Sequence, residues 1–156
     1  MSKELNNTNF REESLDSSPS KADIHCALGC DYLDIGCLEL SIDELNIAIQ
    51  LDPTNPYYYE CRGRIYGEEC EYENSVVDFS KAIGLDDDFA GAYHNRGLSY
   101  YRMDRLEEAI SDYNTAIEIE PHVSLFYSNR GLAHYHNDDF QKAIEDFSIA
   151  IVTCPQ

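Results

Sequence analysis

The sequence is poor in positive charge. Its 156 residues include 11 Lys and Arg against 30 Asp and Glu, which gives a formal net charge of −19. Such an acidic chain repels nucleic acid phosphates and anionic membrane surfaces, so we expect neither as a partner. No apolar run approaches the roughly 20 residues that a membrane-spanning helix needs. The opening MSKELNNTNF also lacks the apolar segment of a secretory signal. We therefore expect a cytoplasmic protein whose six cysteines stay reduced.

Residue patterns typical of enzymes are also missing. No Ser or Cys has a His and an orienting acid at a recognisable spacing, and no Gly-rich phosphate loop is present. His94 and His136 could serve as acid–base groups, but an isolated His on a surface is more often a polar contact. We expect a protein that is not an enzyme and needs no cofactor.

What the sequence does contain is a repeat of 34 residues. Four ladders of similar residues run through the chain at this spacing. They are Gly29, Gly63, Gly97 and Gly131; Ala48, Ala82, Ala116 and Ala150; Pro53, Pro121 and Pro155, with Asp87 at the missing place; and Tyr32, Tyr66 and Tyr100, with His134 at the fourth place. The repeat divides the chain into units 22–55, 56–89, 90–123 and 124–156.

Each unit is predicted to be a pair of helices. In the second half of a unit, apolar or small residues stand at offsets 0, 3, 4, 7, 10 and 11, which is one stripe of an α-helix and does not fit a strand. In the third unit these residues are Leu106, Ala109, Ile110, Tyr113, Ala116 and Ile117. The first half is also helical, and its central Gly costs about 1 kcal/mol against Ala. We expect the partner helix to pass so close that a Cβ would collide, with the small Ala residues facing the Gly.

The repeat resembles the tetratricopeptide repeat family over residues 22–156. HCALGCDYL, YECRGRIYG, YHNRGLSYY and YSNRGLAHY carry the first half of the family pattern, and EEAISDYNTAIEIEP and QKAIEDFSIAIVTCP carry the second. The first unit departs most, at His25, Ser41 and Leu45. The resemblance implies an all-α solenoid, a right-handed superhelix whose first helices line a concave groove. It also implies a non-catalytic scaffold or adaptor that binds an extended or helical peptide of a partner protein.

Helical spacing then selects the residues that face this groove. The predicted contacts combine Arg, His and Asn donors with apolar and Tyr side chains, a surface suited to a peptide backbone or a carboxylate. They are Arg64, His94, Asn95, Leu98, Tyr101, Arg102, Ser128, Asn129 and His136. The family's carboxylate clamp for chaperone tails is expected to be absent, because Glu60 stands where it needs Lys and Leu125 stands in its final pair.

Two further sites stay open as alternatives. Cys26 and Cys30 lie one helical turn apart and should face Cys61 on the next first helix; the three thiols could bind zinc or copper(I), with Asp23 or water as a fourth ligand. The simpler interpretation is that they act as small apolar residues, since no CxxC pair or suitably spaced His is present. We therefore predict no metal, with this cluster as the candidate if one binds.

The second alternative is self-association. Phe147, Ile151 and Val152 would have no following unit to cover them, which favours a homodimer through the C-terminal helix or docking of another protein there. A third alternative is that this chain is part of a longer repeat array. Arg96 and Arg130, beside the ladder Gly, are expected to pair with Asp112 and Asp146.

Residues 1–21 are expected to form a disordered polar tail. A phosphorylated docking segment at Ser17, Ser18 and Ser20 is the alternative for this part of the chain.

Overall fold

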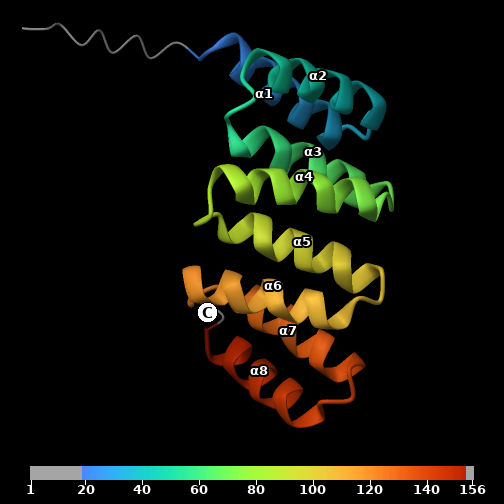
Figure 1. Cartoon of the computed structure of the whole chain (residues 1–156). Helices are drawn as coiled ribbons and strands as arrows, with labels where there is room; N and C mark the ends of the chain where they lie inside the picture. Colours follow the sequence, from blue (N-terminus) through green and yellow to red (C-terminus); the bar gives the residue numbers. More distant parts are fainter. Residues whose placement is uncertain (1–18, 154–156) are drawn as a thin grey trace, which may run out of the picture.

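The protein is a single row of helix pairs. The computed structural model describes residues 19–153, and within this range it contains eight α-helices and no strand. The helices are α1 (Lys21–Asp34), α2 (Leu38–Leu51), α3 (Pro56–Glu68), α4 (Tyr72–Leu85), α5 (Ala90–Arg102), α6 (Leu106–Ile119), α7 (Ser124–His136) and α8 (Phe140–Thr153). They pack as α1 with α2, α3 with α4, α5 with α6 and α7 with α8, and the pairs stack in chain order (Figure 1). The expected all-α solenoid is confirmed.

Helix α1 begins inside the segment that was expected to be a tail. The Ser20 hydroxyl accepts a hydrogen bond from the Asp23 backbone N–H, and the Asp23 carboxylate accepts from the Ser20 N–H. This capping box satisfies two N–H groups at the helix end, so Lys21 is already helical. The expected end of the tail at residue 21 is therefore wrong, because Lys21 belongs to α1. Residues 1–18, which include Ser17 and Ser18, lie outside the described residues.

The ladder glycines mark where the two helices of a pair approach most closely. A Cβ added to Gly97 would lie 2.9 Å from the Tyr113 ring and 3.2 Å from the Ala109 carbonyl oxygen. Phe79 and Phe147 crowd Gly63 and Gly131 in the same way. The expected collision is confirmed. The small Ala109 does face Gly97 through its backbone, but a large side chain of the second helix also fills the space at each of these glycines, which was not expected.

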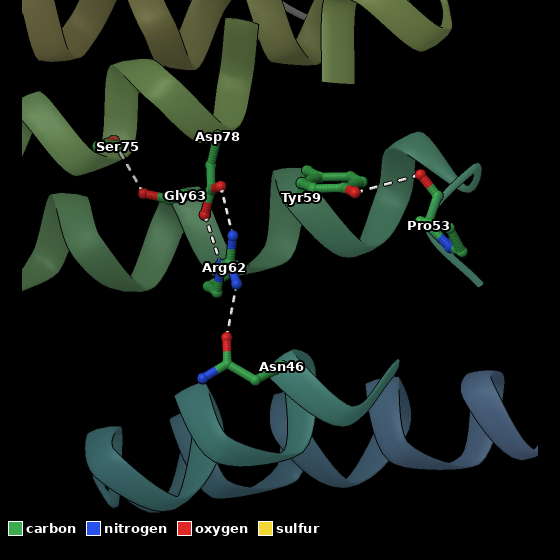
Figure 2. A network of polar contacts seen from close by, with 7 residues as sticks. All are labelled: Asn46, Pro53, Tyr59, Arg62, Gly63, Ser75 and Asp78. Atoms are coloured by element: carbon green, nitrogen blue, oxygen red, sulfur yellow. Dashed lines mark hydrogen bonds and ion pairs between the residues drawn. The ribbon is translucent and has the colours of Figure 1, made fainter. Parts of the chain in front are cut away.

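An arginine ties each of the last three units to the preceding one. The Arg62 guanidinium donates to both carboxylate oxygens of Asp78 at 2.7 Å, and its other end donates to Asn46 (Figure 2). One side chain of α3 thus connects α4 with α2. The expected pairs Arg96–Asp112 and Arg130–Asp146 are confirmed, and these arginines also donate to Ser80 and Asn114.

The turn inside each unit forms a fifth ladder, which sequence analysis missed. Gly36, Cys70, Asp104 and Asp138 share a positive φ of 77°, 60°, 59° and 57°. This left-handed conformation reverses the chain between the two helices of a unit. It is open to Gly without cost but is disfavoured for a residue with a Cβ. Among the described residues, no helix has the length and hydropathy to cross a membrane.

Candidate functional site

The first helices of successive units lie side by side and are joined by pairs of side chains 35 residues apart. Asn95 of α5 donates its amide to Glu60 of α3, with 3.0 Å between Nδ2 and Oε1. Asn129 of α7 stands in the same relation to His94 of α5, with 2.7 Å between Nδ2 and Nε2. At the equivalent place between α1 and α3 the two residues are Cys26 and Cys61. We call Cys26–Cys61, Glu60–Asn95 and His94–Asn129 the first, second and third inter-helix pairs.

The second and third pairs hold ionisable groups away from water. Glu60 is 7% exposed, and burial raises the pKa of its carboxyl although Arg64 opposes the shift. His94 is also 7% exposed and lies against the rings of Tyr113 and Phe126, with centroids at 5.8 and 4.9 Å. Its Nε2 must accept the bond from Asn129, because an amide nitrogen only donates. Burial lowers the pKa of His94, so the ring is neutral at pH 7.

A hollow of about 510 Å³ opens next to the second pair, between α3, α4 and α5. Four of the predicted groove residues line it, namely Arg64, Asn95, Leu98 and Arg102. Its far wall comes from α4, through Tyr72, Ser75 and Phe79, and from Cys70 in the turn. Sequence reasoning missed this wall because it assigned the groove to the first helices alone. The Gly63 position was the available signal, since the missing Cβ lets the Phe79 ring of the second helix pack against α3 beneath the hollow.

The other predicted residues lie outside this hollow. Tyr101 and His136 contact each other edge to face, with ring centroids 5.6 Å apart, where α5 meets α7. Ser128 and Asn129 are half-buried on α7. His94 was expected at the surface, and this expectation is wrong: the ring is buried and holds Asn129 in place.

Two of the lining residues of the hollow, Arg64 and Arg102, are positively charged, and Glu68 is its acidic lining residue. Arg64 reaches no closer than 4.0 Å to the Glu60 carboxylate, and its side chain is 47% exposed. Arg102 has no ion pair within residues 19–153. By contrast, the arginines of the inter-unit ties are held by Asp, and Arg105 and Lys142 pair with neighbouring acids. The two guanidinium groups of the hollow can therefore donate to a carboxylate or to backbone carbonyls.

Comparison with known proteins identifies one repeat and the fold of the chain. A tetratricopeptide repeat profile matches residues 90–123, the unit of α5 and α6. The crystal structure of MamA is similar over 89% of this chain and 81% of that one, with 28% identity and a TM-score of 0.80. Residues 90–123 match a tetratricopeptide repeat, and the fold of the chain is that of a tetratricopeptide repeat solenoid. None of the curated protein sequences compared with it matches.

Two more distant structures share the fold of this repeat protein. The Arabidopsis OM64 TPR domain is 22% identical, with 74% of this chain and 96% of that one covered and a TM-score of 0.72. The first TPR of Spaghetti (RPAP3), solved bound to the HSP90 peptide SRMEEVD, is 23% identical, with 82% and 94% covered and a TM-score of 0.67.

The repeat protein also brings three thiols together. The sulfur atoms of Cys26, Cys30 and Cys61 all lie within 4.8 Å of one another, and all three cysteines are free. Burial, with Cys61 nearby, raises the pKa of Cys30 to about 11. The hydrogen bond with Cys26 and burial also raise the pKa of Cys61. Asp23 was named, beside water, as a possible fourth ligand if a metal binds. Its carboxylate instead accepts from Tyr58 and Ser20, so it is not part of this cluster.

Proposed function

We propose that this protein is a non-catalytic scaffold that binds a peptide segment of a partner protein in its concave groove, anchored in the hollow between α3, α4 and α5. Protein–protein interaction is the role that the tetratricopeptide fold suggests. The observation that carries the finer proposal is the hollow itself. It has room for one or two side chains and an apolar floor at Leu98, with the buried Phe79 behind it. It also holds two guanidinium groups: Arg102 has no ion pair within residues 19–153, and Arg64 has only the 4.0 Å contact with Glu60.

The chemistry of the hollow favours a peptide that combines an acidic group with an apolar side chain. Arg64 and Arg102 would bind the carboxylate, while Leu98 would contact the apolar group. The RPAP3 domain was solved with an acidic HSP90 peptide. We propose that this chain does not use the chaperone-tail clamp. Glu60, where that clamp needs Lys, is buried and already accepts from Asn95.

Peptide display followed by calorimetry tests this proposal. A peptide selected by the wild-type protein should lose at least about tenfold in affinity on the double change Arg64→Ala and Arg102→Ala, since a hydrogen bond to a charged group contributes about 1.5–3 kcal/mol. Asn95 and Asn129 are less suitable targets because they also hold Glu60 and His94.

The control variant removes two positive charges that lie outside the hollow. Arg105→Ala and Lys142→Ala delete two cations whose pairs are exposed and lie outside the hollow. Peptide affinity should stay within about twofold of wild type in this control, because exposed pairs contribute little. If both double variants bind the peptide equally, or if display selects no peptide, the groove is not the binding surface.

A second candidate function is assembly through α8, and the exposure of one repeat position favours it. Ile49, Ile83 and Ile117 are half-buried against the following unit, whereas the equivalent Ile151 is 77% exposed. Phe140, Ile144 and Val152 on the same helix are 52%, 61% and 85% exposed. We propose that a second copy of this chain covers this surface, because removing large apolar side chains from water lowers the free energy of the system.

Sedimentation velocity over a range of concentrations tests the assembly. The sedimentation coefficient of the wild-type protein should rise with concentration, and Ile151→Lys with Val152→Lys should abolish the rise. Val77→Lys is the matched control, because Val77 is an apolar residue of α4 that is 66% exposed away from this surface. A concentration-independent monomer in the wild type would refute assembly and leave groove binding untouched.

A further inference from the structure

The first inter-helix pair differs in chemistry from the other two. The second and third pairs each join an acceptor to an amide donor by a hydrogen bond. In the first pair both residues are cysteines, and Cys30, one turn after Cys26, adds a third thiol. A thiol is a weak donor and a weak acceptor, so this pair gains little as a hydrogen bond. The contact between α1 and α3 does not require three thiols, since the repeat protein makes the equivalent contact twice without any.

The three sulfur atoms lie at a separation that suits one metal ion. Cys30 Sγ and Cys61 Sγ are 3.8 Å apart, and no sulfur is more than 4.8 Å from another. Sulfurs bound to one ion at about 2.3 Å are about 3.8 Å apart in tetrahedral geometry and about 4.0 Å apart in a planar trigonal site. The largest sulfur separation exceeds these values by no more than about 1 Å. Rotation of one cysteine side chain closes this difference and brings all three sulfurs into contact with the same ion.

We propose that Cys26, Cys30 and Cys61 form a binding site for one thiophilic metal ion, zinc(II) or copper(I). Thiolates select these soft and borderline ions over the hard cations that prefer oxygen ligands. Each thiol would give its proton to solvent as its metal–sulfur bond forms. Three thiolates satisfy copper(I) without a further ligand, while zinc(II) would take a water molecule as its fourth ligand, as in zinc sites that keep one open position.

The surroundings supply a path for the ion and a partial balance of charge. A second hollow of about 200 Å³ reaches Cys30 and Cys61 and is also lined by Asp34, Tyr57 and Arg64. An ion can therefore reach Cys30 and Cys61 without unfolding the helices, and Cys26 lies one helical turn before Cys30. The net charge of −19 attracts cations to the protein as a whole. The Arg64 guanidinium offsets part of the charge that three thiolates would bring to the site.

Metal titration of a cysteine-restricted protein tests this site. Cys37→Ser, Cys70→Ser and Cys154→Ser leave the three cluster thiols as the only cysteines of the chain. This variant is titrated anaerobically, with a phosphine reductant, against zinc(II) or copper(I) in competition with a chromophoric chelator. We expect one equivalent of at least one of the two metals to bind. X-ray absorption should show about three sulfur neighbours at about 2.3 Å.

The matched variant adds Cys30→Ser to this background. Cys30 is half-buried whereas Cys26 and Cys61 are 4% and 3% exposed, so its replacement disturbs the helix packing least. The metal affinity should fall at least 100-fold while circular dichroism stays unchanged. The site is refuted if the cysteine-restricted protein binds neither metal stoichiometrically, if both variants bind equally, or if the absorption spectrum shows only nitrogen and oxygen neighbours. The sulfur count decides the question even if Cys30→Ser fails to fold.

Discussion

The contact of Gly97 with the Tyr113 ring sets two opposing effects against each other at one residue. Alanine in a helix is favoured over glycine by about 1 kcal/mol, but its Cβ at position 97 would lie 2.9 Å from a fully buried ring. Overpacking costs about 1–3 kcal/mol. Gly97→Ala should therefore destabilise the protein by about 1 kcal/mol in urea unfolding. Gly84→Ala is the control, because its Cβ meets nothing within 4 Å, and it should stabilise α4. Equal effects at both positions would contradict the steric origin of the ladder.

Cys70 has the same turn conformation as Gly36 but has a Cβ. At φ 60° a residue with a Cβ carries a steric cost of about 1–2 kcal/mol in the folded protein. Glycine avoids this cost, but its greater backbone entropy in the unfolded chain cancels part of the benefit. Cys70→Gly should raise the free energy of unfolding by about 1 kcal/mol. Cys70→Ala keeps the Cβ and should leave it nearly unchanged. The turn explanation fails if both variants shift the urea midpoint alike.

His94 makes stability depend on pH. Its pKa is lowered in the folded protein by burial, while in the unfolded chain it returns to about 6.5. Its contribution is fully present above pH 6.5 and is lost as the pH falls from there toward the folded pKa, because only the unfolded chain takes up the proton. Between pH 7.5 and 5.5, wild type should lose about 1 kcal/mol more than His94→Gln, which keeps an acceptor for Asn129. Parallel pH profiles of the two proteins would exclude His94 as the cause.

At the scale of the helix pair, the arginine ties should stabilise more than exposed ion pairs do. Arg96 of α5 holds Asp112 of α6, which is 6% exposed, and reaches Ser80 of α4. Removing the guanidinium leaves a buried carboxylate unpaired, so Arg96→Ala should cost about 3 kcal/mol. Arg105→Ala, which breaks an exposed pair with Glu108, should change the urea midpoint little. A similar loss in both variants would show that the tie is no stronger than a surface pair.

The helix pairs were predictable because their signals are local and repeated. The stripe at Leu106, Ala109 and Ile110 follows from helical spacing, and the four ladders follow from the 34-residue repeat. The pairing of Arg96 with Asp112 follows from opposite charges on neighbouring helices. The shape of the groove was not predictable in the same way. It depends on how the second helices pack behind the first, as with Phe79 against Gly63, and on which predicted contact residues bond to each other inside the protein, as with His94 and Asn129.

At the scale of the whole molecule, each helix pair contacts only its neighbours in the row. Helices α3 to α6 have a unit on both sides, whereas the outer surface of α8 is exposed at Ile144 and Ile151. In such arrays stability is approximately a sum of unit terms and nearest-neighbour interface terms, so a unit with one neighbour opens at lower free energy. Amide hydrogen exchange of the monomeric protein should therefore be slowest in α3 to α6.

The nearest-neighbour interface also sets how much faster the amides of α8 exchange than those of α6. One interface contribution of about 1.4 kcal/mol makes opening tenfold more frequent, so amides of α8 should exchange at least about tenfold faster than those of α6. If α8 is instead covered by a second copy, protection of α8 should rise with protein concentration in the wild type but not in Ile151→Lys with Val152→Lys. Uniform protection from α1 to α8 at low concentration would mean that the row unfolds as one cooperative unit, and the nearest-neighbour description would then be wrong for this protein.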